Sequence, residues 1–393
     1  MRKKGVKILI TTRHYLPAYL AGGPIQTIAA FSHYLKEYFD IYIHSTNRDS
    51  VINSEFKGIP LNSWITTKDS KNYYSDKHGV SISSLYRVIK DLSPDVIYIS
   101  SFFDHVFTVK ILILRRLGLI DKSISVILAT RGEFAQSALL QNNIKKRIYI
   151  IFFKLFKVYD GINYHVSSSL EHNDLTKVFN THQYNKIFVL NDLSLMNPIG
   201  MQAKIKAMNK SAKTLKMCFV SRISQVKNLD YALQILSRVK ASVVFDIYGP
   251  ISNNSYWAQC ERIIEKMPEH VNVNYHGSVK HDAVQSTISK YDMFFLPTKG
   301  ENFGHIIIEA LSSATPVLIS DNTQWNDIVQ YNSGWAIPLP RSDKFIETID
   351  MFATLDLSNR RKFFKSSLEY YTEKMNQTLL IENYRQAFDH IEK

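Results

Sequence analysis

The sequence predicts an α/β protein built from two doubly wound domains. Short apolar runs typical of buried strands alternate with amphipathic segments in both halves of the chain, and this alternation favours parallel strands joined by crossover helices. The length of 393 residues exceeds a comfortable single domain. Residues 197–213 are rich in Lys, Met, Asn and Gln, as linkers often are. We therefore expect domains at 1–200 and 214–376, followed by a terminal segment at 377–393.

In the first half, each expected strand is a short aliphatic or aromatic run, and each expected helix is an apolar-periodic segment. The expected strands are 7–11, 41–45, 96–100, 124–130, 162–166 and 187–190. The expected helices are 24–37, 81–91, 105–118, 134–158 and 168–179, the second of which begins at a serine that can cap it. Residues 46–78 are polar, and we expect them to be irregular with one short strand.

The second half repeats this alternation. Its expected strands are 215–220, 243–248, 271–275, 293–296 and 316–319. Its expected helices are 228–240, 255–267, 281–289, 304–313 and about 377–391. The strand at 293–296 is stopped by Pro297. The last helix places Leu380, Tyr384 and Phe388 on one face.

The charge, the cysteines and the length of the apolar runs indicate the environment in which the protein works. The net charge is +13, and residues 1–200 hold 25 Lys and Arg against 15 Asp and Glu, so the positive charge lies mainly in the N-terminal half. Cys218 and Cys260 are the two cysteines, and Cys218 falls in an expected buried strand, which favours a reducing cytoplasm. No apolar run reaches the roughly 18 residues that a membrane span needs. The basic start is too weakly apolar for a signal peptide, so we interpret it as a leader into the first strand.

The segment 144–157 mixes Lys and Arg with aliphatic and aromatic residues. Such a helix suits the surface of an anionic membrane. Alternatively, Ile148, Ile151, Phe152 and Leu155 form the buried face of a core helix. Nucleic-acid binding also fits basic patches with aromatics, but no recognisable nucleic-acid module is present.

The most informative stretch runs from Gly300 to Leu311, because it joins a loop to an apolar helix start and carries two carboxylates. The backbone N–H groups of Asn302, Phe303 and Gly304 would lie at a helix N-terminus, where unpaired donors and the helix dipole favour a phosphate. Gly304 has no Cβ and lets a ligand approach the backbone. The carboxylates, Glu301 and Glu309, can clamp sugar and ribose hydroxyls through charge-assisted hydrogen bonds. The plainer alternative makes Glu301 a helix N-terminal charge and Glu309 an exposed helix residue.

Two cations follow the first strand of the second half. Arg222 and Lys227 bracket the loop between the expected strand 215–220 and the next helix, at the same sheet edge as Glu301. Fixed cations there would neutralise the charge that grows on a diphosphate leaving group. Gly249 ends the next strand in a glycine turn at that edge and could border the nucleotide.

These residues resemble the retaining glycosyltransferases of the GT-B fold, in particular the large family 4 of capsule, O-antigen and exopolysaccharide type. That family has a Glu-x7-Glu signature, which here is Glu301 to Glu309, and an Arg…Lys pair, which here is Arg222 and Lys227. The resemblance implies two Rossmann-like domains facing across a cleft, with the terminal helix returning to the N-terminal domain. It implies that the cations grip the donor diphosphate, that Glu301 and the 302–304 amides hold the sugar, and that Glu309 holds the ribose.

The resemblance extends to the N-terminal half. Gly22 and Gly23 resemble the family's glycine loop at the donor phosphates. Arg131 and Glu133, with Lys145 and Lys146, resemble an acceptor-binding segment of capsule and O-antigen transferases, and 165–171 resembles the segment that precedes the interdomain crossing. The chain departs from the family after the strand 96–100, where many relatives have a histidine near the reacting centre and this chain has Ser or Phe. His105 comes several residues late, and we interpret it as a helix N-terminal residue.

Together these features predict a metal-independent hexosyltransferase that acts with retention of configuration. Its partners would be a nucleotide-sugar substrate, with UDP favoured over GDP, a lipid-linked saccharide acceptor and the anionic inner face of the plasma membrane, with no other cofactor. Two alternatives stay open: a nucleotide-sugar 2-epimerase of the same fold, and a non-catalytic partner subunit.

Overall fold

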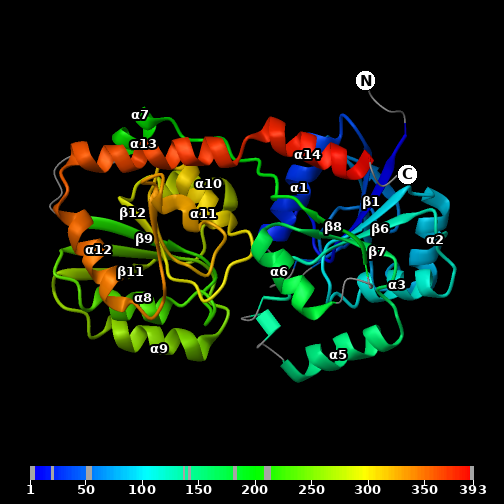
Figure 1. The fold of residues 1–393 in the computed structure, drawn as a ribbon, viewed down its shortest axis with the longest axis horizontal. Coiled ribbons are helices and arrows are strands. Elements are labelled where there is room, and N and C mark those ends of the chain that lie inside the picture. Colours follow the sequence, from blue (N-terminus) through cyan, green and yellow to red (C-terminus); the bar gives the residue numbers. More distant parts are fainter. Residues whose placement is uncertain are drawn as a thin grey trace. The chain divides into compact units, whose positions relative to one another are not determined.

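The structure is a computed structural model, and it describes residues 5–18, 22–49, 55–135, 138–139, 143–179, 184–207 and 214–389. The chain forms two compact units. Unit 1 comprises Met1–Leu195 together with Gln377–Lys393, and unit 2 comprises Met196–Asn376. Each unit is an α/β body with its own sheet (Figure 1).

Unit 1 contains an eight-stranded sheet in the order β3-β4-β2-β1-β5-β6-β7-β8. Its strands are β1 (Lys7–Thr11), β2 (Asp40–Thr46), β3 (Trp64–Thr66), β4 (Lys71–Ser75), β5 (Val96–Ile99), β6 (Ser125–Ala129), β7 (Ile162–Val166) and β8 (Tyr184–Val189). Neighbouring strands are parallel except for the antiparallel pair β3–β4. Strands β5 and β7 are buried along their whole length, as expected for central parallel strands covered on both faces.

The helices of unit 1 connect these strands and cover the sheet. They are α1 (Gly23–Leu35), α2 (Ile82–Leu92), α3 (Thr108–Arg116), α5 (Asn143–Leu155), α6 (Ser169–Val178) and α14 (Gln377–Asp389). The side chain of Ser81 caps α2, as expected, by accepting a hydrogen bond from the N–H of Ser84. Helix α14 packs on α1, where the ring of Phe388 lies 5.6 Å from that of Phe31.

Unit 2 contains a six-stranded sheet in the order β11-β10-β9-β12-β13-β14, in which every pair is parallel. Its strands are β9 (Leu215–Val220), β10 (Val243–Tyr248), β11 (Val271–Tyr275), β12 (Met293–Leu296), β13 (Val317–Ser320) and β14 (Gly334–Ile337). Its helices are α7 (Met201–Ala207), α8 (Leu229–Leu236), α9 (Asn254–Ile264), α10 (His281–Ile288), α11 (His305–Ser312), α12 (Ser342–Thr354), α13 (Leu357–Lys374) and the short 3-10 helix η2 (Asn326–Val329). Figure 1 shows α8, α9 and α12 on one face of the sheet and α10, α11 and α13 on the other.

The expected strands correspond closely to observed ones, and the structure corrects three other expectations. The expected irregular segment 46–78 contains two strands, β3 and β4, rather than one. Within the expected helix 134–158, residues 134 and 135 form a turn and a bend, and the described helix α5 begins at 143. The expected linker contains α7, whose Lys204 is fully buried in unit 2 and donates hydrogen bonds to Tyr291 O and to Thr315 Oγ1.

Candidate active site

The loops after β9 and β12 form the core of the candidate site in unit 2. Both loops leave the carboxyl ends of neighbouring strands, the edge at which parallel α/β sheets bind ligands. Three hydrogen bonds join them: Asn228 Nδ2 donates to Pro297 O at 2.9 Å, Lys299 N donates to Val226 O at 2.7 Å, and Thr298 Oγ1 donates to the same oxygen at 3.1 Å. Asn228 is buried in the left-handed conformation, with φ of 62°. The two loops therefore form one connected surface.

This surface brings Lys227 and Glu301 together. The Lys227 ammonium forms an ion pair with the Glu301 carboxylate, and both side chains are largely buried, with exposed fractions of 15% and 13%. Two opposite charges thus lie within reach of one small polar molecule. Arg222, in the same loop as Lys227, is exposed. Its guanidinium has no hydrogen-bond or ion-pair partner in the described part of the chain.

The loop 300–304 is held by the segment after β13. Glu301 N donates to Asn322 O at 3.1 Å, and Trp325 Nε1 donates to Phe303 O at 2.5 Å. Gly304 is the N-cap of α11 and has a left-handed φ of 78°, which glycine adopts without steric cost. A Cβ at this position would lie 2.9 Å from Glu301 Cγ and 3.2 Å from Trp325 Nε1. Close packing inside the loop therefore also requires glycine here.

Glu309 lies one turn further along α11 and is buried. The interpretation of Glu309 as an exposed helix residue is therefore wrong. Burial raises the pKa of its carboxyl to about 7. The ring of His281 lies 3.9 Å from this carboxylate, too long for a hydrogen bond. Within the described residues this buried carboxylate accepts no side-chain hydrogen bond.

Gly249 ends β10 beside the loop that carries Arg222. Its φ is 140°, and a Cβ there would overlap the carbonyl oxygen of Ser221. Its N–H donates to Gly277 O at 2.8 Å. Gly249 therefore allows the backbone after β10 to lie against the backbone after β9.

Polar side chains of β10, of β11 and of the segments next to β11 and β12 form a cluster in unit 2. Asp246 accepts hydrogen bonds from Tyr291 OH at 2.7 Å and Asn274 Nδ2 at 2.9 Å, and it lies 3.1 Å from the His276 ring. Burial alone would raise the pKa of Asp246, but these hydrogen bonds lower it below its usual value. The sequence signal for the cluster is a carboxylate within a strand, at a half-buried position of its alternating pattern.

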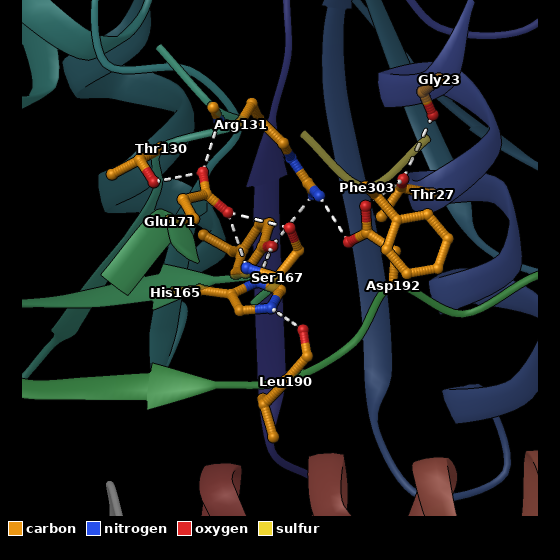
Figure 2. Close-up of polar contacts among 12 residues, drawn as sticks. Gly23, Thr27, Thr130, Arg131, His165, Ser167, Glu171, Leu190, Asp192 and Phe303 are labelled. Carbon is orange, nitrogen blue, oxygen red and sulfur yellow. Dashed lines mark hydrogen bonds and ion pairs between the residues drawn. The ribbon is translucent and has the colours of Figure 1, made fainter. Parts of the chain in front are cut away.

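In unit 1, Arg131 belongs to a buried polar network (Figure 2). Its Nη1 lies 2.7 Å from Asp192 Oδ1, and its Nη2 donates to Tyr98 OH at 3.1 Å. Tyr98 OH donates in turn to His165 Nδ1 at 2.6 Å, and His165 Nε2 donates to Leu190 O at 2.9 Å. Burial lowers the pKa of His165. The two hydrogen bonds of its ring, one accepted and one donated, match a neutral imidazole. Arg131 is only 9% exposed and engages partners within the unit.

Glu171 organises the neighbouring turn (Figure 2). Its carboxylate accepts hydrogen bonds from Thr130 Oγ1 at 2.6 Å, from the N–H of Ser167 at 2.7 Å, and from the N–H of Gly132. These partners follow β6 and β7, so one buried carboxylate joins the carboxyl ends of two strands. The motif at 165–171 thus has a structural role in unit 1.

The other predicted acceptor residues differ in exposure. Glu133 is engaged by the hydroxyl of Ser101, at 2.7 Å, and by the N–H of Phe102, and burial raises its pKa to about 7. Lys146 donates to Ala138 O at 2.6 Å. Lys145, by contrast, is exposed on α5.

The glycine loop and the histidine lie at the carboxyl edge of unit 1. Gly22 is the N-cap of α1, with φ of 72°, and Gly23 is the first residue of that helix. His105 was expected at the N-terminus of a helix, but it lies in the turn before α3, which begins at Thr108. Its ring nitrogens lie 3.0 and 3.1 Å from Arg13 Nη2. The neighbouring Asp104 accepts hydrogen bonds from the N–H groups of Val106 and Phe107 at the start of α3.

Within the described residues, no group of three or more His, Cys, Asp or Glu side chains could hold a metal ion. In the same part of the chain, no helix has both the length and the apolar character needed to cross a membrane.

Both the sequence and the fold of this chain are similar to those of known glycosyltransferases. Residues 201–367 match the family model described as "Glycosyl transferases group 1". Solved structures match over nearly the whole chain: sucrose-phosphate synthase from Thermosynechococcus elongatus has a TM-score of 0.74 at 13% identity and covers 98% of each chain. HepE of Anabaena, in complex with UDP and glucose, has a TM-score of 0.67 at 12% identity and covers 98% of this chain and 100% of its own. The chain has the GT-B fold.

The matches to curated proteins are partial. An uncharacterized 41.2 kDa protein in the cps region of Klebsiella pneumoniae is 23% identical over 209 residues, 52% of this chain and 55% of that protein. The UDP-N-acetylglucosamine–peptide N-acetylglucosaminyltransferase GtfA subunit of Streptococcus parasanguinis is 20% identical over 231 residues, 58% of this chain and 43% of its own. The chain thus spans about half the length of the curated relatives it matches. The group 1 glycosyltransferase match falls within unit 2 of this GT-B chain.

Proposed function

We propose that this chain is a retaining, metal-independent glycosyltransferase that transfers a sugar from a nucleotide-sugar to a lipid-linked saccharide during the synthesis of a bacterial surface polysaccharide. The observation that carries the proposal is the connected surface of the loops after β9 and β12, which presents Arg222, Lys227, Glu301 and the N-terminus of α11 together. Complexes of HepE with UDP and with UDP-glucose support a nucleotide-sugar donor. The cps-region relative supports a role in polysaccharide synthesis.

In this proposal each donor residue has a physical task. Arg222 and Lys227 hold the diphosphate and neutralise the charge that grows as the glycosidic bond breaks. Glu301 and the amides of Asn302, Phe303 and Gly304 hold the sugar. The buried Glu309 accepts hydrogen bonds from the ribose hydroxyls, which would supply side-chain partners that its carboxylate does not have among the described residues.

Other residues would act through the backbone or on the acceptor. Gly22 and Gly23, at the start of α1, are also assigned to donor phosphate binding because they have no Cβ, and Gly249 shapes the loop that carries Arg222. The acceptor diphosphate binds the basic N-terminal unit, where Lys145 is an exposed cation. Arg131, Glu133 and Lys146 support that region through the contacts described above. The reaction takes place at the cytoplasmic face of an anionic membrane.

A binding and turnover experiment tests the donor site. UDP-, GDP- and dTDP-sugars are screened for thermal stabilisation of the purified protein, and transfer is then measured with the stabilising donor and a membrane extract as acceptor. We expect a UDP-sugar to stabilise the protein, and R222A and E301Q to abolish transfer while circular dichroism stays unchanged. The matched control is K266A, which removes an exposed cation just after α9, at the amino end of β11. Retained transfer in R222A or E301Q would contradict the proposed site.

Incubation with donor alone distinguishes the alternative chemistry. A transferase leaves the nucleotide-sugar unchanged without acceptor, apart from slow hydrolysis. Formation of an epimeric nucleotide-sugar in that control would instead identify an isomerase.

A further inference from the structure

One side of helix α5 exposes several large apolar side chains and is called its outer face here. Here the term outer face means Ile144, Ile148, Ile151, Phe152 and Leu155, which are 53–75% exposed. Their spacing of three, four and seven residues places them on one side of the helix. Among the described residues, helix α5 lies at the outside of its unit (Figure 1). Five large exposed apolar side chains in one stripe exceed what scattered surface residues explain.

The opposite side of α5 is firmly attached to the unit. Ile150 and Phe153 are buried in the core cluster, and the ring of Tyr149 packs on that of Phe153 at 4.4 Å. Lys154 donates to Val178 O, and Arg116 Nε donates to Phe156 O at 3.2 Å. The exposed apolar side is therefore not a core face that has simply failed to pack, because the helix already has its core face elsewhere.

Cations border the outer face on both sides. At 100° per residue, Lys145 falls on one flank of the stripe and Arg147 falls on the other. Lys157 follows the helix and is exposed. No Asp or Glu occurs between Glu133 and Asp160. The charges that α5 itself carries are therefore all positive.

We propose that α5 lies in the plane of an anionic lipid bilayer, with its outer face among the acyl chains and its flanking cations among the lipid phosphates. An apolar stripe between rows of Lys and Arg is the pattern of interfacial helices, and long basic side chains can reach the headgroups while their stems remain apolar. A second copy of the chain is a poorer occupant, because a symmetric contact would bring the uncompensated cations of two α5 helices together. The inference goes beyond the transfer reaction and does not depend on it, since vesicle binding requires neither donor nor acceptor.

Cosedimentation with lipid vesicles tests this proposal on the full chain. We expect binding to vesicles of phosphatidylglycerol and phosphatidylcholine, and little binding to phosphatidylcholine alone. The variant I148S/I151S/L155S removes the centre of the outer face, and R147Q/K157Q removes two cations. Each cation near an anionic surface contributes about 1 kcal/mol, so the second variant should lose about tenfold or more in vesicle affinity. The control V329S/M351S removes two exposed apolar side chains from unit 2 and should bind as the native protein does.

A spectroscopic probe gives a second, independent measurement. The native tryptophans are Trp64, Trp257, Trp325 and Trp335, so none lies in α5. F152W places one in the outer face, and its emission should shift to shorter wavelength with anionic vesicles but not with phosphatidylcholine vesicles.

Three results would overturn the proposal. One is native affinity for anionic vesicles in both α5 variants, with their circular dichroism unchanged. Another is an unshifted F152W emission when the protein sediments with vesicles. The third is a native protein that does not bind vesicles and forms a dimer in solution, while the I148S/I151S/L155S variant is a monomer. A second copy of the chain would then cover this face.

Discussion

At the residue scale, Gly249 illustrates a glycine required by the protein's own backbone. Its φ of 140° is one that other residues rarely adopt, and a Cβ would overlap the Ser221 carbonyl beside Arg222. We expect G249A to destabilise unit 2 by at least about 1–3 kcal/mol, the usual cost of overpacking, and to weaken donor binding because the Arg222 loop must move. Chemical denaturation and nucleotide titration measure both effects. G200A is the control, since a Cβ there meets no atom within 4 Å; equal stabilities of G249A and G200A would contradict the argument.

Glu309 gives a pH dependence whose sign follows from its burial. The pKa of the carboxyl is raised from 4.5 to about 7 in the folded protein. Between these values the folded state holds a proton that the unfolded state has released, so stability falls as pH rises, by about 3 kcal/mol in all. E309Q removes this contribution. We therefore expect E309Q to match the native protein near pH 4 and to be more stable at pH 8, while binding donor more weakly.

The measurement is urea denaturation of both proteins across this pH range. Subtracting the free energy of unfolding of one protein from that of the other at each pH cancels the contributions of all other titrating groups. These include Glu133, whose pKa is also raised to about 7. A difference that stays constant with pH would show that Glu309 titrates normally. Such loss of stability in exchange for a ligand contact is common at functional sites.

Some contacts of single residues could be predicted from the sequence, and others could not. The proximity of Lys227 and Glu301 could be expected from the sequence, because each lies in a short loop after one of two buried strands. The partners of Arg131 could not, since Asp192 is 61 positions away and Tyr98 is 33 positions away. An arginine in a turn has the same local pattern whether it faces solvent or a buried carboxylate.

At the scale of elements, strands were more predictable than helices with polar buried faces. Strands such as β12 are continuous apolar runs bounded by turn residues, and their bounds agree with the expectation. Helix α13 was not expected, because its buried face includes Arg360 and Ser367, which weaken the apolar periodicity. Arg360 is tolerated there because it lies 3.3 Å from Asp292. Such compensation between distant elements leaves no signal within the helix itself.

At the scale of the whole molecule, unit 1 depends on the last helix of the chain. Phe388 of α14 is buried, and its ring lies 5.6 Å from that of Phe31 and 5.8 Å from that of Phe39. Each unit has its own sheet and core, so we expect each to give its own unfolding transition. A donor nucleotide that is held mainly by unit 2 should raise the transition of that unit more than that of unit 1, which identifies the two transitions.

F388A tests this division. Truncating a buried phenylalanine costs about 3–5 kcal/mol, so we expect the transition of unit 1 to move to lower temperature. The nucleotide-sensitive transition of unit 2 should stay in place, even though residue 388 follows unit 2 in the sequence. Scanning calorimetry with and without the donor nucleotide measures both, and Q386A, on the exposed side of α14, is the control. If F388A lowers the nucleotide-sensitive transition equally, the two units unfold together, and α14 stabilises the whole chain rather than unit 1.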